Sequence, residues 1–234
     1  MMNSNIFLIP TVLDESALQT IPPYIIDAVK ACQVIFAENE RTARRFLKAI
    51  CKDIIIDDYT WYTIHKTEDE VIAAFQQHIR EGKNIAIMSE AGCPGIADPG
   101  QILVAVAQQM NARIHPLVGP SSILLALMAS GMNGQQFEFL GYLPIDVQER
   151  TKAIVALEQN SQKKKSTQLF IETPYRNNQL LETLLKTCKP NTRICIASEI
   201  TSANEYIKTK TVAEWKQEKL DLHKKPVIFL LYAG

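Results

Sequence analysis

The segment best suited to bind a ligand is residues 85–100, where an apolar strand pattern runs into a glycine-rich loop. Ile-Ala-Ile-Met is followed by Ser-Glu-Ala-Gly-Cys-Pro-Gly-Ile-Ala-Asp-Pro-Gly, and seven of the nine glycines lie between residues 92 and 141. Glycine loses more backbone entropy on folding than other residues, so this crowding predicts positive φ angles or close approach of the backbone to a ligand. Pro94 and Pro99 restrict φ beside the glycines, and a stiff loop at the carboxyl end of a strand is where open α/β sheets bind ligands. The competing interpretation is that each glycine only turns the chain.

The usual nucleotide-binding and hydrolase motifs are absent from the sequence. No G-x-G-x-x-G follows the first strand pattern, where the chain reads Ile-Pro-Thr-Val-Leu-Asp-Glu-Ser, and there is no G-x-x-x-x-G-K-[ST]. A G-x-S-x-G nucleophile motif is also missing, and the four histidines do not follow metal-ligand spacings. Dinucleotide oxidoreductases and P-loop NTPases are therefore excluded, and hydrolases and metalloenzymes lose their usual support.

Composition predicts an ordinary cytoplasmic protein. The chain has 234 residues, is 47% hydrophobic and 21% charged, and carries no formal net charge. No apolar run approaches the roughly 20 residues of a membrane span, and no basic segment precedes an apolar one at the N-terminus. The cysteines are odd in number and widely spaced, which favours reduced core thiols over disulfides or a structural metal; they are Cys32, Cys51, Cys93, Cys188 and Cys195.

Strand and helix patterns alternate in the first half of the chain. Strands are predicted at 6–9, 34–37, 54–56, 85–88 and 114–118, with helices at 22–31, 41–50, 68–81 and 101–110. Thr67 is placed to cap the third of these helices. Such alternation predicts a parallel sheet covered by helices.

The same rhythm resumes after Gly119. Helices are predicted at 121–130, 147–159, 177–187 and 212–219, and strands at 137–140, 168–171, 193–197 and 227–232. We therefore predict an α/β protein with two consecutive α/β domains, residues 1–118 and 119–234.

Charge divides at the same place. The first part holds 10 Lys and Arg against 14 Asp and Glu, and the second holds 15 against 11. Two interpretations stay open: the oppositely charged halves face each other across a cleft, or the difference is unselected surface drift. The run Lys163-Lys164-Lys165 is interpreted as a solvated loop, with contact to a phosphate backbone as the alternative.

Six blocks of sequence resemble one known family. Residues 89–100 resemble the S-D-A-G-T-P-G-I-S-D-P-G loop of the tetrapyrrole methylase superfamily, in the branch of ribosomal RNA small subunit methyltransferase I. Residues 116–122 resemble P-x-P-G-P-S-A, and residues 137–144 resemble F-x-F-x-G-F-L-P. The others are 37–41 for A-E-D-T-R, 172–176 for E-S-P-H-R and 198–201 for R-E-L-T.

This resemblance implies two α/β domains with S-adenosylmethionine bound in a cleft between them, usually in a homodimer. The cofactor-binding residues that it implies on the glycine loop are Ser89, Glu90, Gly92, Cys93, Pro94 and Ile96. It also implies Ser121 and Ser122 near the methionine portion, and Ile171, Ala197 and Pro226 around the adenosine. The alternatives are that the two serines cap a helix and that Ile171 and Ala197 are ordinary sheet residues.

Methyl transfer from a sulfonium is an in-line displacement, so positioning and water exclusion supply much of the rate. A ribose hydroxyl is a weak acid, and a carboxylate base or a cation beside the developing oxyanion would help. The candidates at or near predicted strand ends are Glu90, Asp98, Glu172 and Glu199, and Arg41 or Arg176 could bind phosphate. We select Glu172 and Arg176 as the catalytic candidates, with structural ion pairs or loop caps as the alternative roles.

Departures from the family pattern concern the acceptor. Residues 10–18 read Pro-Thr-Val-Leu-Asp-Glu-Ser-Ala-Leu where this branch has P-T-P-I-G-N-L-x-D, and Asn39, Glu40, Glu90 and Tyr175 also differ. The sequence ends at Gly234 without the C-terminal extension of many of these enzymes, so the resemblance is to a short form. The function that we predict is ribose 2′-O-methylation of small-subunit ribosomal RNA. A tetrapyrrole or other small-molecule acceptor, and a module that binds S-adenosylmethionine without transfer, remain as alternatives.

Overall fold

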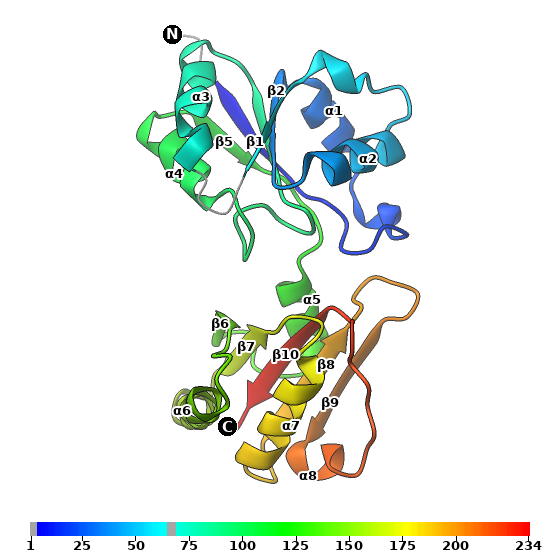
Figure 1. Cartoon of the computed structure of the whole chain (residues 1–234), viewed down its shortest axis with the longest axis vertical. Coiled ribbons are helices and arrows are strands. Elements are labelled where there is room, and N and C mark those ends of the chain that lie inside the picture. Colours follow the sequence, from blue (N-terminus) through cyan, green and yellow to red (C-terminus); the bar gives the residue numbers. More distant parts are fainter. Residues whose placement is uncertain (1–3, 65–68) are drawn as a thin grey trace. The chain divides into compact units, whose positions relative to one another are not determined.

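The computed structural model describes residues 4–64 and 69–234, so the cap predicted at Thr67 lies outside the described residues. The chain divides into two compact units, Met1–Ser121 and Ser122–Gly234, and each is built around its own five-stranded sheet (Figure 1). The predicted α/β class with two consecutive α/β domains is confirmed. No helix in the described ranges is both long and apolar enough to cross a membrane.

The sheet of the first unit is parallel throughout, as the alternating pattern predicted. Its strands are β1 (Asn5–Ile9), β2 (Val34–Ala37), β3 (Thr60–Thr63), β4 (Ile85–Met88) and β5 (Arg113–Pro116). They lie in the order β3-β2-β4-β1-β5. Ile85 is paired with Ile6 on one side and with Val34 on the other, so β4 is central. Because all the strands point the same way, the loops after them meet at one edge of the sheet.

Helices cover both faces of this sheet (Figure 1). α1 (Tyr24–Lys30) and α2 (Glu40–Ile50) contribute to one core, and α3 (Asp69–Arg80) and α4 (Gln101–Gln109) to the other. Along β2, Ile35 packs in the first core, whereas Val34 and Phe36 pack in the second. A strand that buries both of its faces reads as a continuous apolar run, which explains Val-Ile-Phe-Ala.

The strand predicted at 54–56 is wrong. Ile54 is buried, but Ile55 is 61% exposed, and Ile56–Asp58 forms a short 3-10 helix, η2. The strand that pairs with β2 is β3, and Trp61 of β3 donates its indole N–H to the carbonyl of Ile56 at 3.0 Å. Three consecutive isoleucines resemble the pattern of a buried strand, but only the side chain of Ile54 is buried in the core.

The second unit has a mixed sheet, which the sequence pattern did not predict. Its strands are β6 (Phe137–Tyr142), β7 (Thr167–Ile171), β8 (Arg193–Ser198), β9 (Tyr206–Thr211) and β10 (Val227–Tyr232), in the order β6-β7-β10-β8-β9. β6 and β7 are parallel, and every other pair is antiparallel. β9 was missed because Tyr-Ile-Lys-Thr-Lys-Thr is polar and lies at the sheet edge.

The helices of this unit are α5 (Ser122–Ser130), α6 (Val147–Lys164), α7 (Asn177–Thr187) and α8 (Val212–Trp215). α8 is shorter than the predicted helix at 212–219, whereas α6 is longer than the predicted helix at 147–159. Lys163 and Lys164 therefore lie in the last turn of α6, and Lys165 ends it with a φ of 51°. The solvated loop predicted for this run is thus a helix end, where basic residues interact favourably with the helix dipole.

Candidate functional site

Hydrogen bonds join the loops after three strands at the carboxyl edge of the first sheet. The amide of Thr11, after β1, donates to the carbonyl of Gly92, after β4, at 2.8 Å. The amide of Glu90 donates to the carboxylate of Glu38, after β2, also at 2.8 Å. This edge is the part of a parallel sheet where α/β proteins bind ligands.

The glycines of the loop adopt the conformations that their crowding predicted. Gly92, Gly95 and Gly100 have φ angles of +75°, +79° and +122°. A Cβ on Gly92 would lie 3.3 Å from a methyl group of Leu13, and a Cβ on Gly100 would lie 3.1 Å from one of Ile87. A side chain at either position would be strained by backbone conformation and crowded by its neighbour.

The segment after β5 packs against this loop. The thiol of Cys93 lies 3.5 Å from the carbonyl oxygen of Pro120, and Gly119 directly faces Pro10 of the loop after β1. Ser121 follows immediately and is partly buried, whereas Ser122 begins α5 in the second unit. Ser121 therefore directly follows a segment that packs against the glycine loop, and both belong to the first unit.

Three carboxylates gather beside the glycine loop. Burial, followed by the charges of Glu38 and Glu90, raises the pKa of Asp98 to about 6. Glu90 accepts hydrogen bonds from the amide group of Asn39 at 3.1 Å and the hydroxyl of Thr42 at 3.2 Å. Burial and the Asp98 charge also raise the pKa of the Cys93 thiol. This edge therefore disfavours additional negative charge and keeps Cys93 protonated at neutral pH.

A pocket of about 290 Å³ opens between the loop after β1, helix α2 and the start of the glycine loop. Its apolar lining is Val12, Leu13, Leu18, Phe46, Ala49 and Ala91. Its polar lining is Thr11, Glu15, Thr42, Arg45 and Glu90. Arg45 and Glu15 form an ion pair at the exposed end.

Helix α2 is set by its N-cap at Asn39, whose side chain accepts the amide of Thr42 at 3.2 Å. From this start the helix buries Phe46, and it presents Arg45 and the exposed Ala49 to the pocket. The sequence pattern did not indicate a site role for Thr42, Arg45 or Phe46. The available signal was the block at 37–41, which places a cap directly after a buried strand.

The expected cofactor residues on the glycine loop differ in exposure. Ser89, Gly92 and Pro94 are buried, Cys93 is partly buried, and Glu90 is exposed. Ile96 is 54% exposed. The buried residues hold the backbone of the loop in place, and the exposed residues form the surface of the loop.

The remaining expected residues lie together at one end of the second sheet. Ile228 of β10 pairs with Ile171 of β7 on one side and with Ala197 of β8 on the other. Pro226 precedes β10, and its carbonyl accepts the amide of Glu199 at 3.0 Å. The structure therefore brings the three expected adenosine contacts, Ile171, Ala197 and Pro226, to one sheet end.

Glu172 and Arg176 form an ion pair just after β7. The carboxylate Oε1 of Glu172 accepts from Nη2 of Arg176 at 2.6 Å, from Nε at 3.1 Å and from the amide of Thr173 at 2.6 Å. The Glu172 side chain is fully buried, and the Arg176 side chain is 30% exposed. Glu172 raises the pKa of Arg176. Arg176 is the member of the pair that solvent or a ligand can reach.

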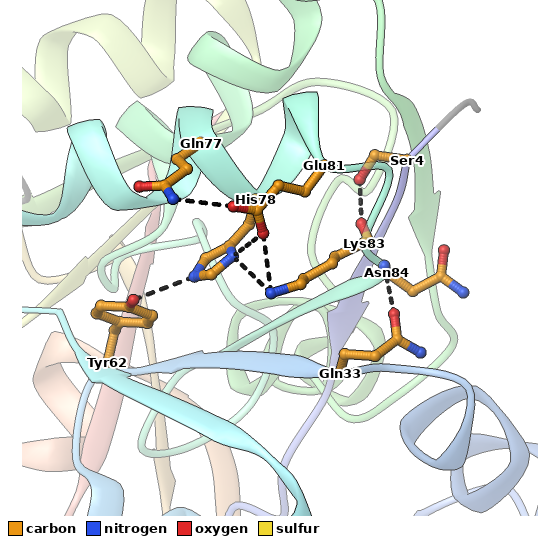
Figure 2. A network of polar contacts seen from close by, with 8 residues as sticks. All are labelled: Ser4, Gln33, Tyr62, Gln77, His78, Glu81, Lys83 and Asn84. Carbon is orange, nitrogen blue, oxygen red and sulfur yellow. Dashed lines mark hydrogen bonds and ion pairs between the residues drawn. The ribbon is translucent and has the colours of Figure 1, made fainter. Parts of the chain in front are cut away.

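A second polar network lies at the opposite, amino end of the first sheet (Figure 2). Nε2 of His78 lies 3.1 Å from the hydroxyl of Tyr62, and Nδ1 lies 3.2 Å from Glu81, which pairs with Lys83 at 2.9 Å. Ser4, before β1, donates to the carbonyl of Lys83. Ser4 and Lys83 precede strands β1 and β4, and His78 of α3 reaches Tyr62 of β3, so the network joins α3 to the sheet and involves none of the residues of the glycine loop.

The known proteins that this chain resembles in sequence and in fold are methyltransferases. The chain is 29% identical over 232 residues to the ribosomal RNA small subunit methyltransferase I of Buchnera aphidicola, covering 98% of this chain and 78% of that protein. Its fold is similar to that of the methyltransferase CobJ, with a TM-score of 0.64, 16% identity and coverage of 99% and 94%. It also resembles the uroporphyrin-III C-methyl transferase of Thermus thermophilus, solved with S-adenyl homocysteine, with a TM-score of 0.56, 14% identity and coverage of 98% and 97%.

The model of the family described as Tetrapyrrole (Corrin/Porphyrin) Methylases matches residues 18–216, which include helix α2, the glycine loop and the Glu172–Arg176 pair. The predicted family is thus confirmed: the chain belongs to the tetrapyrrole methylases, a family of S-adenosylmethionine-dependent methyltransferases.

Proposed function

We propose that this methyltransferase modifies ribosomal RNA of the small subunit, at the 2′ oxygen of a ribose. The observation that carries the proposal is the 29% identity, over 98% of the chain, to a protein named for methylation of that RNA. The matched region includes the tied loops at the carboxyl edge of the first sheet. We also propose that the protein acts in the cytoplasm and that it forms a homodimer. Light scattering of the purified protein tests the oligomeric state.

The loops at this edge fit a small organic cofactor. Gly92 is buried and has a positive φ, and a Cβ on Gly119 would overlap Pro10, so the backbones of these loops pack closely against one another. The exposed Ile96 offers apolar contact beside them. In the proposal Cys93 and Ile96, beside Gly92, line the part of the cofactor site that the first unit provides, and Ser121 lies near the methionine portion.

S-adenosylmethionine would supply a methyl group on a sulfonium: the S–C bond breaks, an O–C bond forms to the ribose oxygen, S-adenosylhomocysteine leaves, and the hydroxyl proton passes to water. The chain contributes orientation, exclusion of water and stabilisation of charge. Arg176 is the proposed cation for the developing oxyanion or for a neighbouring phosphate. Because Glu172 is buried and bound to Arg176, it acts in this proposal as a positioning residue.

Calorimetric titration with S-adenosylmethionine and S-adenosylhomocysteine tests the cofactor site. Wild-type protein should bind both, Ser121→Trp should not, and Ala73→Trp, a control on the exposed side of α3, should bind as wild type does. Absence of wild-type binding at millimolar ligand would contradict the cofactor assignment.

Transfer of labelled methyl groups to undermodified small ribosomal subunits tests the acceptor. Incorporation that resists alkaline hydrolysis of the RNA at one position supports ribose methylation. Transfer to uroporphyrinogen but not to RNA would replace the proposed acceptor by a tetrapyrrole. Binding of cofactor with transfer to neither would identify a binding module.

A further inference from the structure

The pocket beside helix α2 has the size of a site for one ring system. Its volume of about 290 Å³ lies at the lower limit of small-molecule sites, which span roughly 300–1,000 Å³. A tetrapyrrole macrocycle, with four linked rings, exceeds this space. A planar ring system of one or two rings fits it.

The walls of the pocket suit a flat apolar surface. Phe46, Leu13 and Leu18 line it from α2 and from the loop after β1, and Ala49 and Ala91 leave space between them. Enzymes that act on an extruded nucleotide hold its base between aromatic or apolar side chains in this way.

The polar groups of the pocket include both acceptors and donors. Glu90 and Glu15 supply carboxylate oxygens, and Arg45 supplies guanidinium N–H groups. The Watson–Crick edge of a base also carries donors and acceptors side by side. Within the protein, Arg45 pairs with Glu15, and Glu90 accepts hydrogen bonds from Asn39 and Thr42, so a base would share these polar groups at the pocket edge.

The pocket is continuous with the loop that is proposed to hold the cofactor. Glu90 and Ala91 belong to both, and Thr11 lines the pocket while its amide binds the carbonyl of Gly92 at 2.8 Å. Several lining positions are also those at which the chain departs from the family pattern, among them Val12, Leu13, Glu15, Leu18 and Glu90. Pocket residues that differ from the family pattern, beside a cofactor loop that keeps it, are suited to selecting the acceptor.

We propose that this pocket binds one unstacked nucleobase of the acceptor RNA, with Leu13 and Leu18 against its face and Glu90 and Arg45 at its polar edge. This inference rests on the proposed RNA acceptor. It assigns base selection to the first unit and to residues that the family motifs do not include.

The test replaces an exposed alanine at the rim of the pocket by a larger side chain that fills the pocket. Ala49→Trp should bind S-adenosylmethionine with the wild-type dissociation constant and raise the KM for undermodified small subunits by about tenfold or more. Ala73→Trp is the matched control and should behave as wild type in both assays. A wild-type KM for Ala49→Trp would overturn the proposal, and so would loss of cofactor binding, since the pocket would then belong to the cofactor.

A second pair of variants separates base contact from general charge. Arg45→Gln should raise the KM for RNA more than Lys48→Gln, which removes the same charge from an exposed position of the same helix outside the pocket. Equal effects of the two variants would show that Arg45 acts only as a surface charge and would overturn its role here.

Direct binding keeps the inference testable if no RNA is methylated. Carbon-13 methyl spectra should show shifts for Leu13, Leu18 and Ala49, and none for Ala73, when ribonucleoside monophosphates are added at millimolar concentration. If these shifts occur and the protein binds S-adenosylmethionine but methylates no RNA, the proposed function is contradicted while the nucleobase pocket is supported. Absence of such shifts, with transfer intact, would contradict the pocket alone.

Discussion

Gly119 and Pro10 are packed so closely that a Cβ on the glycine would lie 2.1 Å from the Cβ of the proline. This contact joins the loop after β5 to the loop after β1, at the edge where the glycine loop also lies. A glycine is required here for space, because any side chain would overlap a ring that cannot rotate away.

Gly119→Ala should therefore shift the segment that carries Ser121. We expect a loss of unfolding free energy of about 1–3 kcal/mol, the usual cost of overpacking, together with weaker binding of S-adenosylmethionine. Gly134→Ala is the control, because a Cβ on Gly134 meets no atom within 4 Å. Urea denaturation and calorimetry measure both effects, and equal behaviour of the two variants would refute the packing argument.

The Glu172–Arg176 pair predicts an order of stabilities. Arg176→Gln leaves a buried carboxylate without its cation, so it should be less stable than Glu172→Gln/Arg176→Gln, in which no buried charge remains. Thermal unfolding of the wild type, both single variants and the double variant forms the cycle that measures this coupling. A double variant less stable than Arg176→Gln would mean that the pair is not the reason for the loss.

The same variants separate two roles for Glu172. If Glu172 positions Arg176, then Glu172→Gln, which still accepts a hydrogen bond, should retain more methyl transfer than Arg176→Gln. If Glu172 is the base, Glu172→Gln should be the more damaging change and should remove the acidic limb of the pH profile. Single-turnover rates measured against pH decide between them.

Asp98 should titrate near pH 6. Its pKa is raised above the ordinary value of 3.8 by burial and by Glu38 and Glu90, so the folded protein holds this proton more tightly than the unfolded chain. The linkage therefore lowers stability as pH rises from about 4 to about 6, and the penalty is fully present at neutral pH. Asp98→Asn should be more stable than wild type at pH 7.5, with the difference closing toward pH 4.

Carboxyl carbon-13 titration measures this pKa directly. Glu38→Gln should lower the pKa of Asp98, because one like charge is removed from its surroundings. Asp53→Asn, an exposed aspartate in the same unit, should leave the pKa of Asp98 unchanged. A value for Asp98 near 3.8 in wild type would contradict the carboxylate cluster.

The network in Figure 2 has the opposite pH dependence. Hydrogen bonds from Lys83, Gln77 and His78 lower the pKa of Glu81 from 4.5 to about 2, so its stabilising effect is present above about pH 4.5 and is lost as pH falls toward 2. Glu81→Gln should be less stable than wild type at pH 7, with the gap closing on acidification and with added salt. Acid titration followed by circular dichroism shows this, and a gap that stays constant down to pH 2 would contradict it.

The sequence alone determined the class of fold and the location of the glycine-rich loop. Val-Ile-Phe-Ala and Ile-Ala-Ile-Met are apolar at every position, which is typical of a strand buried on both faces. The glycines and prolines of residues 92–100 likewise predicted positive φ angles, because the constraint is local to each residue. The family resemblance rested on the same short segments.

The tertiary structure decided which distant residues meet. The pairing of β10 between β7 and β8, the edge position of β9 and the exposure of Ile55 depend on strand order, which hydrophobic periodicity does not encode. The pocket unites the loop after β1 with α2 and with Glu90, and these segments become neighbours only because β1, β4 and β2 are adjacent in the sheet. A local pattern specifies the conformation of a segment, whereas contacts between segments depend on how the whole chain packs.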